Sequence, residues 1–421
     1  MDNLLETLLE EGFLAISEAR LGTPRLCQFP ESEKMIKVAI GMRRSGKSYF
    51  LYQTINAFLD QGIKPEQILL INFEDDRLLP MNAKEMGQLL DNFYSLYPEN
   101  HHRRCYFFLD EVQNIEDWNL VVRRYFDKKD TQIYLTGSSA KLLSTEINTN
   151  LRGRSLAVEI FPYSFKEYLS AHQIKPLKGP FGQASLDLMK SHLLNYFSRG
   201  GFPAVQAMSM NDWRETLRNY VDTTLLRDII ERHNIGNTQL LKYLATSLLK
   251  NAASPFSINK FFNDIKSQGL QVSKETLHTY LGYLEDAFLV FTVPFYSESE
   301  RERQTRPKKI YAVDSGLINM VSLGSGAGAQ EAHGKLFENL IYLDLRRQNK
   351  KIYFYNTQEG YEIDFVTVSP EGHRELIQVV WDIEDPKTKD REERALVQAE
   401  QELGISGRIL TVRDYLKNYS R

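Results

Sequence analysis

Cysteine is almost missing from this chain. Only Cys27 and Cys105 occur among its 421 residues, which excludes a disulfide framework and a cysteine-based zinc site. Long hydrophobic runs are missing too, since no apolar stretch approaches the roughly 20 residues that span a bilayer. The first residues, Met1-Asp-Asn-Leu-Leu-Glu6, are acidic and unlike a signal peptide. We therefore expect a protein of the reducing cytoplasm with no membrane partner.

A large excess of charge of one sign is the third absence. The formal net charge is −3 and 25% of the residues are charged. This balance argues against a protein that binds DNA over its whole surface, but it leaves local basic patches open. The hydrophobic fraction of 42% is ordinary for a globular protein. A chain of this length suggests two or three domains.

Between about residues 35 and 165, short β-branched runs alternate with segments of helical periodicity. This alternation predicts an α/β fold in which a parallel sheet carries helices on both faces. The strands that we predict are 35–40, 67–73, 105–110, 132–136 and 156–161.

Residues 41–48 read Gly-Met-Arg-Arg-Ser-Gly-Lys-Ser and match the phosphate-binding loop of P-loop NTPases. A strand-like run precedes the motif and a helical run follows it, as the motif requires. Lys47 can reach the β- and γ-phosphates of a nucleotide, and the Ser48 hydroxyl can ligate Mg²⁺. Arg43 and Arg44 fit phosphate contacts and surface charges equally well. The predicted nucleotide-binding residues are Gly41, Arg43, Arg44, Ser45, Gly46, Lys47 and Ser48.

Two carboxylates end the apolar run Tyr106-Phe-Phe-Leu-Asp-Glu111. In a parallel sheet this strand end lies beside the phosphate loop, where ligands bind. Asp110 would hold Mg²⁺, directly or through water, and Glu111 would act as general base on the attacking water. The alternative is that Asp110 caps the turn that follows.

Hydroxyl groups and arginines are further candidates for the predicted active site. Thr136, Ser138 or Ser139 could sense the γ-phosphate or position the attacking water. The alternative, which fits the sequence equally well, is that these hydroxyls only form a polar strand end and the N-cap of the next helix. Arg152 or Arg154 could stabilise charge on the transferring phosphoryl group, in cis or from a neighbouring subunit. A surface loop is the alternative for both arginines.

Taken together, these motifs resemble the prokaryotic AAA+-type ATPases of the AAA_14 group, which are fused to a C-terminal DUF4143 region. The resemblance covers nearly the whole chain and implies ATP as the nucleotide. It also implies that Lys47 binds the phosphates, that Ser48 binds Mg²⁺, and that Asp110 with Glu111 forms the Walker B pair. Ser138 would lie in the sensor segment. Arg152 or Arg154 would be the arginine finger, the residue that stabilises charge on the transferring phosphoryl group. Because such a finger usually acts across an interface, a homo-oligomer is expected. The segments that carry the resemblance are Gly41–Ser48, Ile71–Asp75, Leu109–Gln113, Leu135–Ser139, Leu151–Arg154 and Ile160–Tyr168.

The expected fold is therefore a P-loop NTPase domain, then a helical and winged-helix region, and then an α/β domain resembling a degenerate restriction nuclease. The predicted division is a helical lead-in (1–30), the ATPase domain (31–170), a helical lid region (171–250), a winged-helix-like domain (251–309) and a nuclease-like DUF4143 domain (310–421).

Two helical segments, 257–269 and 273–285, precede a strand-like run at 289–293, which is the winged-helix order. In a DNA reader the second helix would enter a major groove and turn Lys274 outward. That helix has few basic residues, which disfavours phosphate contact. The stretch 301–309 adds five basic residues and is predicted as a hairpin tip or linker. Protein contact is favoured here, and DNA contact stays open.

The C-terminal pattern resembles the PD-(D/E)xK nuclease core. Glu338 lies in an apolar helical run and Asp364 in a strand-like run, but Gln378 and Val380 stand where Glu and Lys are expected. The neutral Gln378 removes one negative metal ligand, and Val380 cannot orient water. We predict a degenerate nuclease fold that is used for binding.

Three other interpretations of this region stay open: residual metal-dependent cleavage, a different fold, or a buried Asp364 that pairs with Arg374. Lys387 lies beyond a proline, so no nearby lysine clearly replaces the missing one.

Three functions follow from these motifs. The first is an ATPase that hydrolyses ATP with Mg²⁺ to drive or switch contacts of its C-terminal regions, and the intact Asp110-Glu111 pair favours it. The second is a regulatory binding module with little turnover. The third is a DNA-processing ATPase with a working nuclease, which Gln378 and Val380 oppose.

Overall fold

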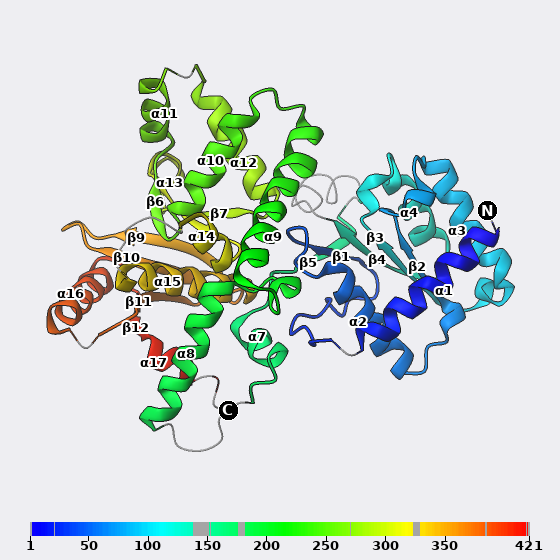
Figure 1. The fold of residues 1–421 in the computed structure, drawn as a ribbon, viewed down its shortest axis with the longest axis horizontal. Coiled ribbons are helices and arrows are strands. Elements are labelled where there is room, and N and C mark those ends of the chain that lie inside the picture. Colours follow the sequence, from blue (N-terminus) through cyan, green and yellow to red (C-terminus); the bar gives the residue numbers. More distant parts are fainter. Residues whose placement is uncertain are drawn as a thin grey trace. The chain divides into compact units, whose positions relative to one another are not determined.

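The computed structural model describes residues 2–20, 22–137, 151, 153–175, 182–269, 271–322, 329–383, 385–417 and 419. The chain forms two compact units, Met1–Phe161 and Pro162–Arg421, called here the first and the second unit (Figure 1). The finer division into five parts stays a prediction.

The first unit is built on a parallel five-stranded sheet in the order β2-β3-β4-β1-β5. Each strand lies within two residues of a predicted one, because buried parallel strands are nearly continuous apolar runs. The predicted parallel sheet is therefore confirmed. The strands are β1 (Ile36–Ile40), β2 (Ile68–Asn72), β3 (Cys105–Asp110), β4 (Thr131–Gly137) and β5 (Ser155–Glu159).

Helices cover both faces of this sheet (Figure 1). Phe108 packs in one cluster with Ile16 and Leu51, whereas the preceding Phe107 contacts the rings of Phe93 and Tyr125. Successive strand residues point to opposite faces, so the two helix pairs lie on opposite sides. The helices are α1 (Asp2–Ala19) with α2 (Lys47–Asp60), and α3 (Ala83–Leu96) with α4 (Trp118–Lys128).

Helix α1 ends earlier than the predicted lead-in, and Ile16 belongs to the hydrophobic core of the first unit. The residues between α1 and β1 are also tied to this unit. Short 3-10 turns complete its connections, at Pro65–Gln67, Asp76–Leu78, Pro98–His102 and Val112–Asn114.

The second unit begins with helices. Gly200 ends α8 at φ 76°, a backbone conformation that favours glycine. A π-helical segment, Thr224–Glu231, follows α9 directly. The helices are α7 (Phe165–Ala171), α8 (Gln183–Arg199), α9 (Met210–Thr223) and α10 (Thr238–Lys250), with a 3-10 turn at Pro203–Val205.

A small antiparallel sheet in the order β6-β8-β7 follows, with two helices beside it. The helices begin at the hydroxyls of Ser257 and Ser273, which accept backbone N–H groups as N-caps. The elements are β6 (Ser254–Phe256), α11 (Ile258–Ser267), α12 (Lys274–Asp286), β7 (Val290–Val293), α13 (Glu300–Thr305) and β8 (Lys308–Ala312). The stretch 301–309, predicted as a hairpin tip or linker, instead forms most of α13 and the start of the central strand β8.

The last part carries a four-stranded sheet in the order β12-β11-β10-β9, in which only the β11–β12 pair is parallel. Asp385 caps α16, Pro386 occupies its first turn, and Gly404 ends it at φ 66°. The elements are α14 (Ser315–Ser322), α15 (Ala329–Arg347), β9 (Lys351–Asn356), β10 (Glu362–Val368), β11 (Arg374–Val380), α16 (Pro386–Leu403), β12 (Gly407–Thr411) and α17 (Val412–Lys417). Within the described ranges, no helix is long and apolar enough to cross a membrane.

Candidate active site

The phosphate loop lies between β1 and α2, and its glycines are required by the backbone. A Cβ atom on Gly41 would lie 2.1 Å from the carbonyl oxygen of Ile160. Gly46 adopts φ 99° as the residue that precedes α2. Other residue types would be strained at Gly46 or would clash at Gly41, so the sequence pattern and the loop geometry agree.

Lys47 points back over its own loop. Its side chain is 3% exposed, and Nζ donates to the carbonyl oxygens of Gly41 at 3.2 Å and Met42 at 3.4 Å. The Ser45 hydroxyl in the same loop is buried and has no hydrogen-bond partner among the described residues. Buried polar atoms are rarely left unpaired. An ammonium group over the loop and an unpaired hydroxyl, at a helix N-terminus, fit a phosphate group.

Asp110 is the last residue of β3 and is buried against two hydroxyl groups. The hydroxyl of Thr136, on β4, donates to Asp110 Oδ1, and the Ser48 hydroxyl also hydrogen-bonds this carboxylate. Burial and the neighbouring Glu111 charge raise the pKa of Asp110 to about 6, against these two hydrogen bonds. Oxygen ligands of this kind suit Mg²⁺, and the structure brings Ser48 and Asp110 together, where the two residues could hold such an ion.

Glu111 adopts φ 50° immediately after β3, and its carboxylate lies among positive and polar groups. Its Oε1 lies 3.4 Å from Lys47 Nζ, and its Oε2 accepts a hydrogen bond from Gln113 Nε2 at 2.5 Å. Burial opposes the charged form, but the Lys47 charge and the Gln113 hydrogen bond outweigh it and hold the pKa of Glu111 below its usual value. Glu111 is therefore a carboxylate at neutral pH and can accept a proton.

Thr136 joins the two acidic residues. Besides donating to Asp110, its Oγ1 accepts the backbone N–H of Glu111 at 2.9 Å. Thr136 was one of three hydroxyl candidates in the sequence, and the structure brings its hydroxyl to the site. Ser138 and Ser139 lie outside the described residues.

Two further residues at the site were missed from the sequence. Gln113 holds Glu111, and the guanidinium of Arg25 donates to the Ser45 carbonyl at 2.9 Å and to the Phe161 carbonyl. Gln113 lies inside a segment that carries the family resemblance, which was the available signal. Arg25 lies in an irregular segment without a motif, so nothing local marked it.

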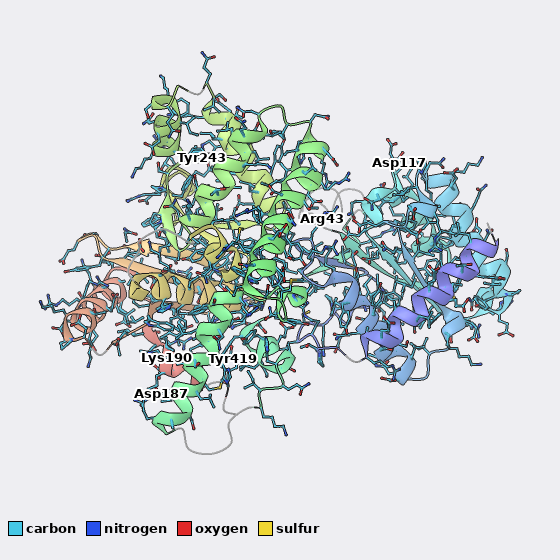
Figure 2. All side chains as sticks on the ribbon, in the orientation of Figure 1. Arg43, Asp117, Asp187, Lys190, Tyr243 and Tyr419 are labelled. Carbon is cyan, nitrogen blue, oxygen red and sulfur yellow. The ribbon has the colours of Figure 1, made fainter. Side chains whose placement is uncertain are left out.

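The two arginines of the loop differ. Arg43, labelled in Figure 2, pairs with Glu74 at 2.7 Å. Arg44 is exposed and adopts φ 66°. In the described geometry, therefore, Arg43 has an acidic partner from the segment after β2, while Arg44 faces solvent.

The two candidates for the arginine finger, Arg152 and Arg154, differ in what the structure shows of them. Arg152 lies outside the described residues. Arg154 forms an ion pair with Asp127 and precedes β5, whose first residue pairs with Ile36 at the start of β1. The phosphate loop follows the other end of β1, about 16 Å away along a five-residue strand. Arg154 thus cannot reach the phosphate loop of its own chain, so a finger role would need a subunit interface, while its ion pair with Asp127 fits the surface-loop alternative.

The winged-helix-like region displays less positive charge than its sequence suggests. Lys274 is exposed on α12, as predicted. However, Arg303 pairs with Glu300, Arg306 pairs with Glu302, and Lys309 is fully buried. Most of the basic stretch 301–309 is thus neutralised within the protein.

The nuclease-like residues do come together. Asp364 accepts a hydrogen bond from Lys309 Nζ at 3.1 Å, Glu338 lies 2.9 Å from the same Nζ, and Gln378 Oε1 accepts the backbone N–H of Asp364 at 3.2 Å. The interpretation that Asp364 pairs with Arg374 is wrong, since its cation is Lys309. The sequence marked no lysine close to these acids, whereas the structure places Lys309 of β8 beside them.

The fold and the site in the first unit define a P-loop protein of the ATPase type, and such a loop implies binding of a nucleotide with a divalent metal ion. The AAA_14 family, described as an AAA domain, matches residues 33–169. Two domains of unknown function match the rest, DUF8612 at residues 190–329 and DUF4143 at residues 333–419.

Two relatives match this chain over most of their own length. The chain is 34% identical to uncharacterized protein MJ1544 of Methanocaldococcus jannaschii, over 90% of this chain and 82% of that protein. It is 31% identical to an uncharacterized protein of Haemophilus influenzae, over 81% of each. The chain therefore belongs to the AAA+-type ATPases of the AAA_14 group with a C-terminal DUF4143 domain.

Among solved structures, the chain is similar to the ORC1 protein of Aeropyrum pernix, a structure in complex with DNA. The identity is 12%, the match covers 76% of this chain and 92% of that one, and the TM-score is 0.27. A likeness this loose carries no argument about function.

Proposed function

We propose that this protein binds ATP and Mg²⁺ at the phosphate loop and hydrolyses ATP to switch the contacts of its winged-helix-like and nuclease-like regions. The convergence of Lys47, Asp110 and Glu111 at one edge of one parallel sheet carries this proposal. Charged residues are rarely buried without a function or a partner, and these three lie where ligands bind in such sheets.

In this proposal each residue has one task. Lys47 leaves the carbonyls of Gly41 and Met42 and binds the phosphates, which replace those two weak acceptors. Ser48 and Asp110 hold Mg²⁺, which neutralises charge on the phosphate oxygens. Glu111 then accepts the proton of the attacking water. The Thr136 hydroxyl fixes the Asp110 carboxylate relative to the backbone of Glu111.

A second candidate function is a regulatory module that binds ATP with little turnover. One observation favours it: Glu111 is held on both oxygens, by Lys47 and by Gln113. A base held in this way is released only when its partners move. A DNA-processing nuclease is the third candidate, and the buried Lys309 among its acids weighs against it.

The proposal is tested by phosphate release from Mg·ATP with and without duplex DNA, at several protein concentrations. We expect slow Mg²⁺-dependent hydrolysis that DNA does not change, because the basic residues near α13 are paired with acids. We also expect the rate per chain to rise with concentration, because Arg154 can act only across an interface. Stimulation by DNA that weakens steeply with salt would instead support the DNA-processing function, and a rate per chain independent of concentration would remove the finger role of Arg154.

Thr136 gives a separate prediction. Thr136→Val keeps the shape of the side chain but removes the hydrogen bonds to Asp110 and to the Glu111 backbone. Leaving buried partners unpaired costs about 1–3 kcal/mol, so we expect roughly a 10- to 100-fold slower hydrolysis with ATP binding retained. The measurement is the hydrolysis rate together with the ATP dissociation constant.

The matched control is Thr54→Val on α2, where the hydroxyl bonds only to the carbonyl of Phe50 in the same helix. Thr54→Val should leave the rate unchanged. Equal rates for Thr136→Val and the unaltered protein would show that the link between the Asp110 carboxylate and the Glu111 backbone is not needed.

A further inference from the structure

A fully buried ammonium group lies inside the acidic cluster of the nuclease-like region. Lys309 is 0% exposed, and its Nζ lies 2.9 Å from Glu338, 2.7 Å from Glu362 and 3.1 Å from Asp364. An ammonium group has three N–H donors, so each donor here has one carboxylate partner. All the hydrogen-bonding capacity of Lys309 is therefore used inside the cluster.

The cluster keeps its cation charged. Burial alone would lower the pKa of Lys309, but the carboxylates of Glu338, Asp364 and Glu362 raise it well above its usual value. The hydroxyl of Tyr311 also donates to Glu338 Oε1 at 2.7 Å. Three carboxylates around one centre form a set of oxygen ligands that a divalent metal ion would take, and here the centre is the ammonium group.

The backbone of β8 fixes Lys309 in this place. Three residues after Lys309, Ala312 exchanges hydrogen bonds with the Asn339 side chain of α15, through its N–H at 2.8 Å and its carbonyl at 3.0 Å. Asp364 is fixed as well, since its second oxygen accepts the backbone N–H of Val379 at 2.9 Å. Lys309 and its partners are thus held by three different elements, β8, α15 and β10.

Gln378 has other tasks. Its Oε1 accepts the backbone N–H of Asp364 at 3.2 Å, and its Nε2 donates to Glu392 Oε2 at 2.7 Å. Both ends of the Gln378 amide are therefore hydrogen-bonded, one to Asp364 of the cluster and the other to Glu392. Two explanations for an inactive metal site now differ: a ligand lost at Gln378, or a centre already filled by Lys309.

We propose that Lys309 is the resident cation of the Glu338, Glu362 and Asp364 cluster, and that its presence, not the loss of a ligand at Gln378, keeps divalent metal ions out of the nuclease-like region. The three carboxylates then form a latent metal site that opens when the ammonium group is removed. This inference concerns the second unit and does not depend on ATP hydrolysis by the first.

The test compares Lys309→Met with Gln378→Glu in the full-length, nucleotide-free protein after removal of metal ions. Mn²⁺ binding is measured by the electron paramagnetic resonance signal of the free ion, and stability by the melting temperature. We expect Lys309→Met to bind one equivalent of Mn²⁺ more than the unaltered protein and to melt several degrees higher when Mn²⁺ is added. Gln378→Glu should gain neither property.

The double variant Lys309→Met with Asp364→Asn is the matched control, and it should lose the added site. The proposal is overturned if Lys309→Met folds without gaining Mn²⁺, or fails to fold even with Mn²⁺ present. It is also overturned if the unaltered protein or Gln378→Glu binds Mn²⁺ in a way that Asp364→Asn abolishes. A Lys309→Met chain that folds only with Mn²⁺ would support it.

Discussion

Lys47→Ala is expected to abolish ATP hydrolysis. The ammonium group lies buried over the phosphate loop, and its present partners are two carbonyls and Glu111. Removing a group that stabilises developing charge on phosphate costs roughly 10²- to 10³-fold in rate. ATP affinity should fall as well, because Lys47 binds the phosphates before and during the reaction. The measurement is phosphate release from Mg·ATP.

Lys84→Ala is the control for this variant, since Lys84 is an exposed lysine on α3 of the same unit. It should hydrolyse ATP at the rate of the unaltered protein. Hydrolysis by Lys47→Ala at that same rate would mean that the phosphates bind elsewhere.

Glu111→Gln is expected to separate ATP binding from turnover. The amide keeps the size of the side chain but cannot accept the proton of water, so hydrolysis should fall roughly 10²- to 10⁴-fold. Binding should persist or improve, because the variant no longer holds Lys47 through an ion pair, at present 3.4 Å long. A nucleotide-binding titration and a single-turnover rate measure the two effects separately.

Glu116→Gln supplies the matching control, because Glu116 is exposed and lies five residues further along the chain. It should change neither quantity. If Glu111→Gln turns over ATP as fast as the unaltered protein, another group activates the water.

Local patterns predicted the first unit well. The strands are continuous apolar runs, and the loop between Gly41 and Ser48 is specified by glycines that its own backbone requires. The acidic pair at the end of β3 followed from the rule that ligands bind at the carboxyl ends of parallel strands. Each of these inferences needs only neighbouring residues and one topological rule.

The other features depend on contacts between residues far apart in the sequence, and these contacts could not be predicted from local patterns. Lys309 lies 55 residues before Asp364, in a basic stretch that suggested a linker, so its pairing with the acids was not visible in the sequence. Thr136 lies 25 residues after Glu111, and only the pairing of β3 with β4 brings its hydroxyl to the Glu111 backbone. The position of Arg154 at the far end of β5 likewise required the strand register.

The central claim is that the phosphate loop of this chain is the site of metal-dependent ATP hydrolysis. Steady-state phosphate release from ATP, measured for the unaltered protein and for Lys47→Ala with Mg²⁺ and with excess chelator, tests it most directly. The account predicts release only from the unaltered protein and only with Mg²⁺. Release that persists in Lys47→Ala, or its absence from the unaltered protein with Mg²⁺ across the tested protein concentrations, would contradict the claim.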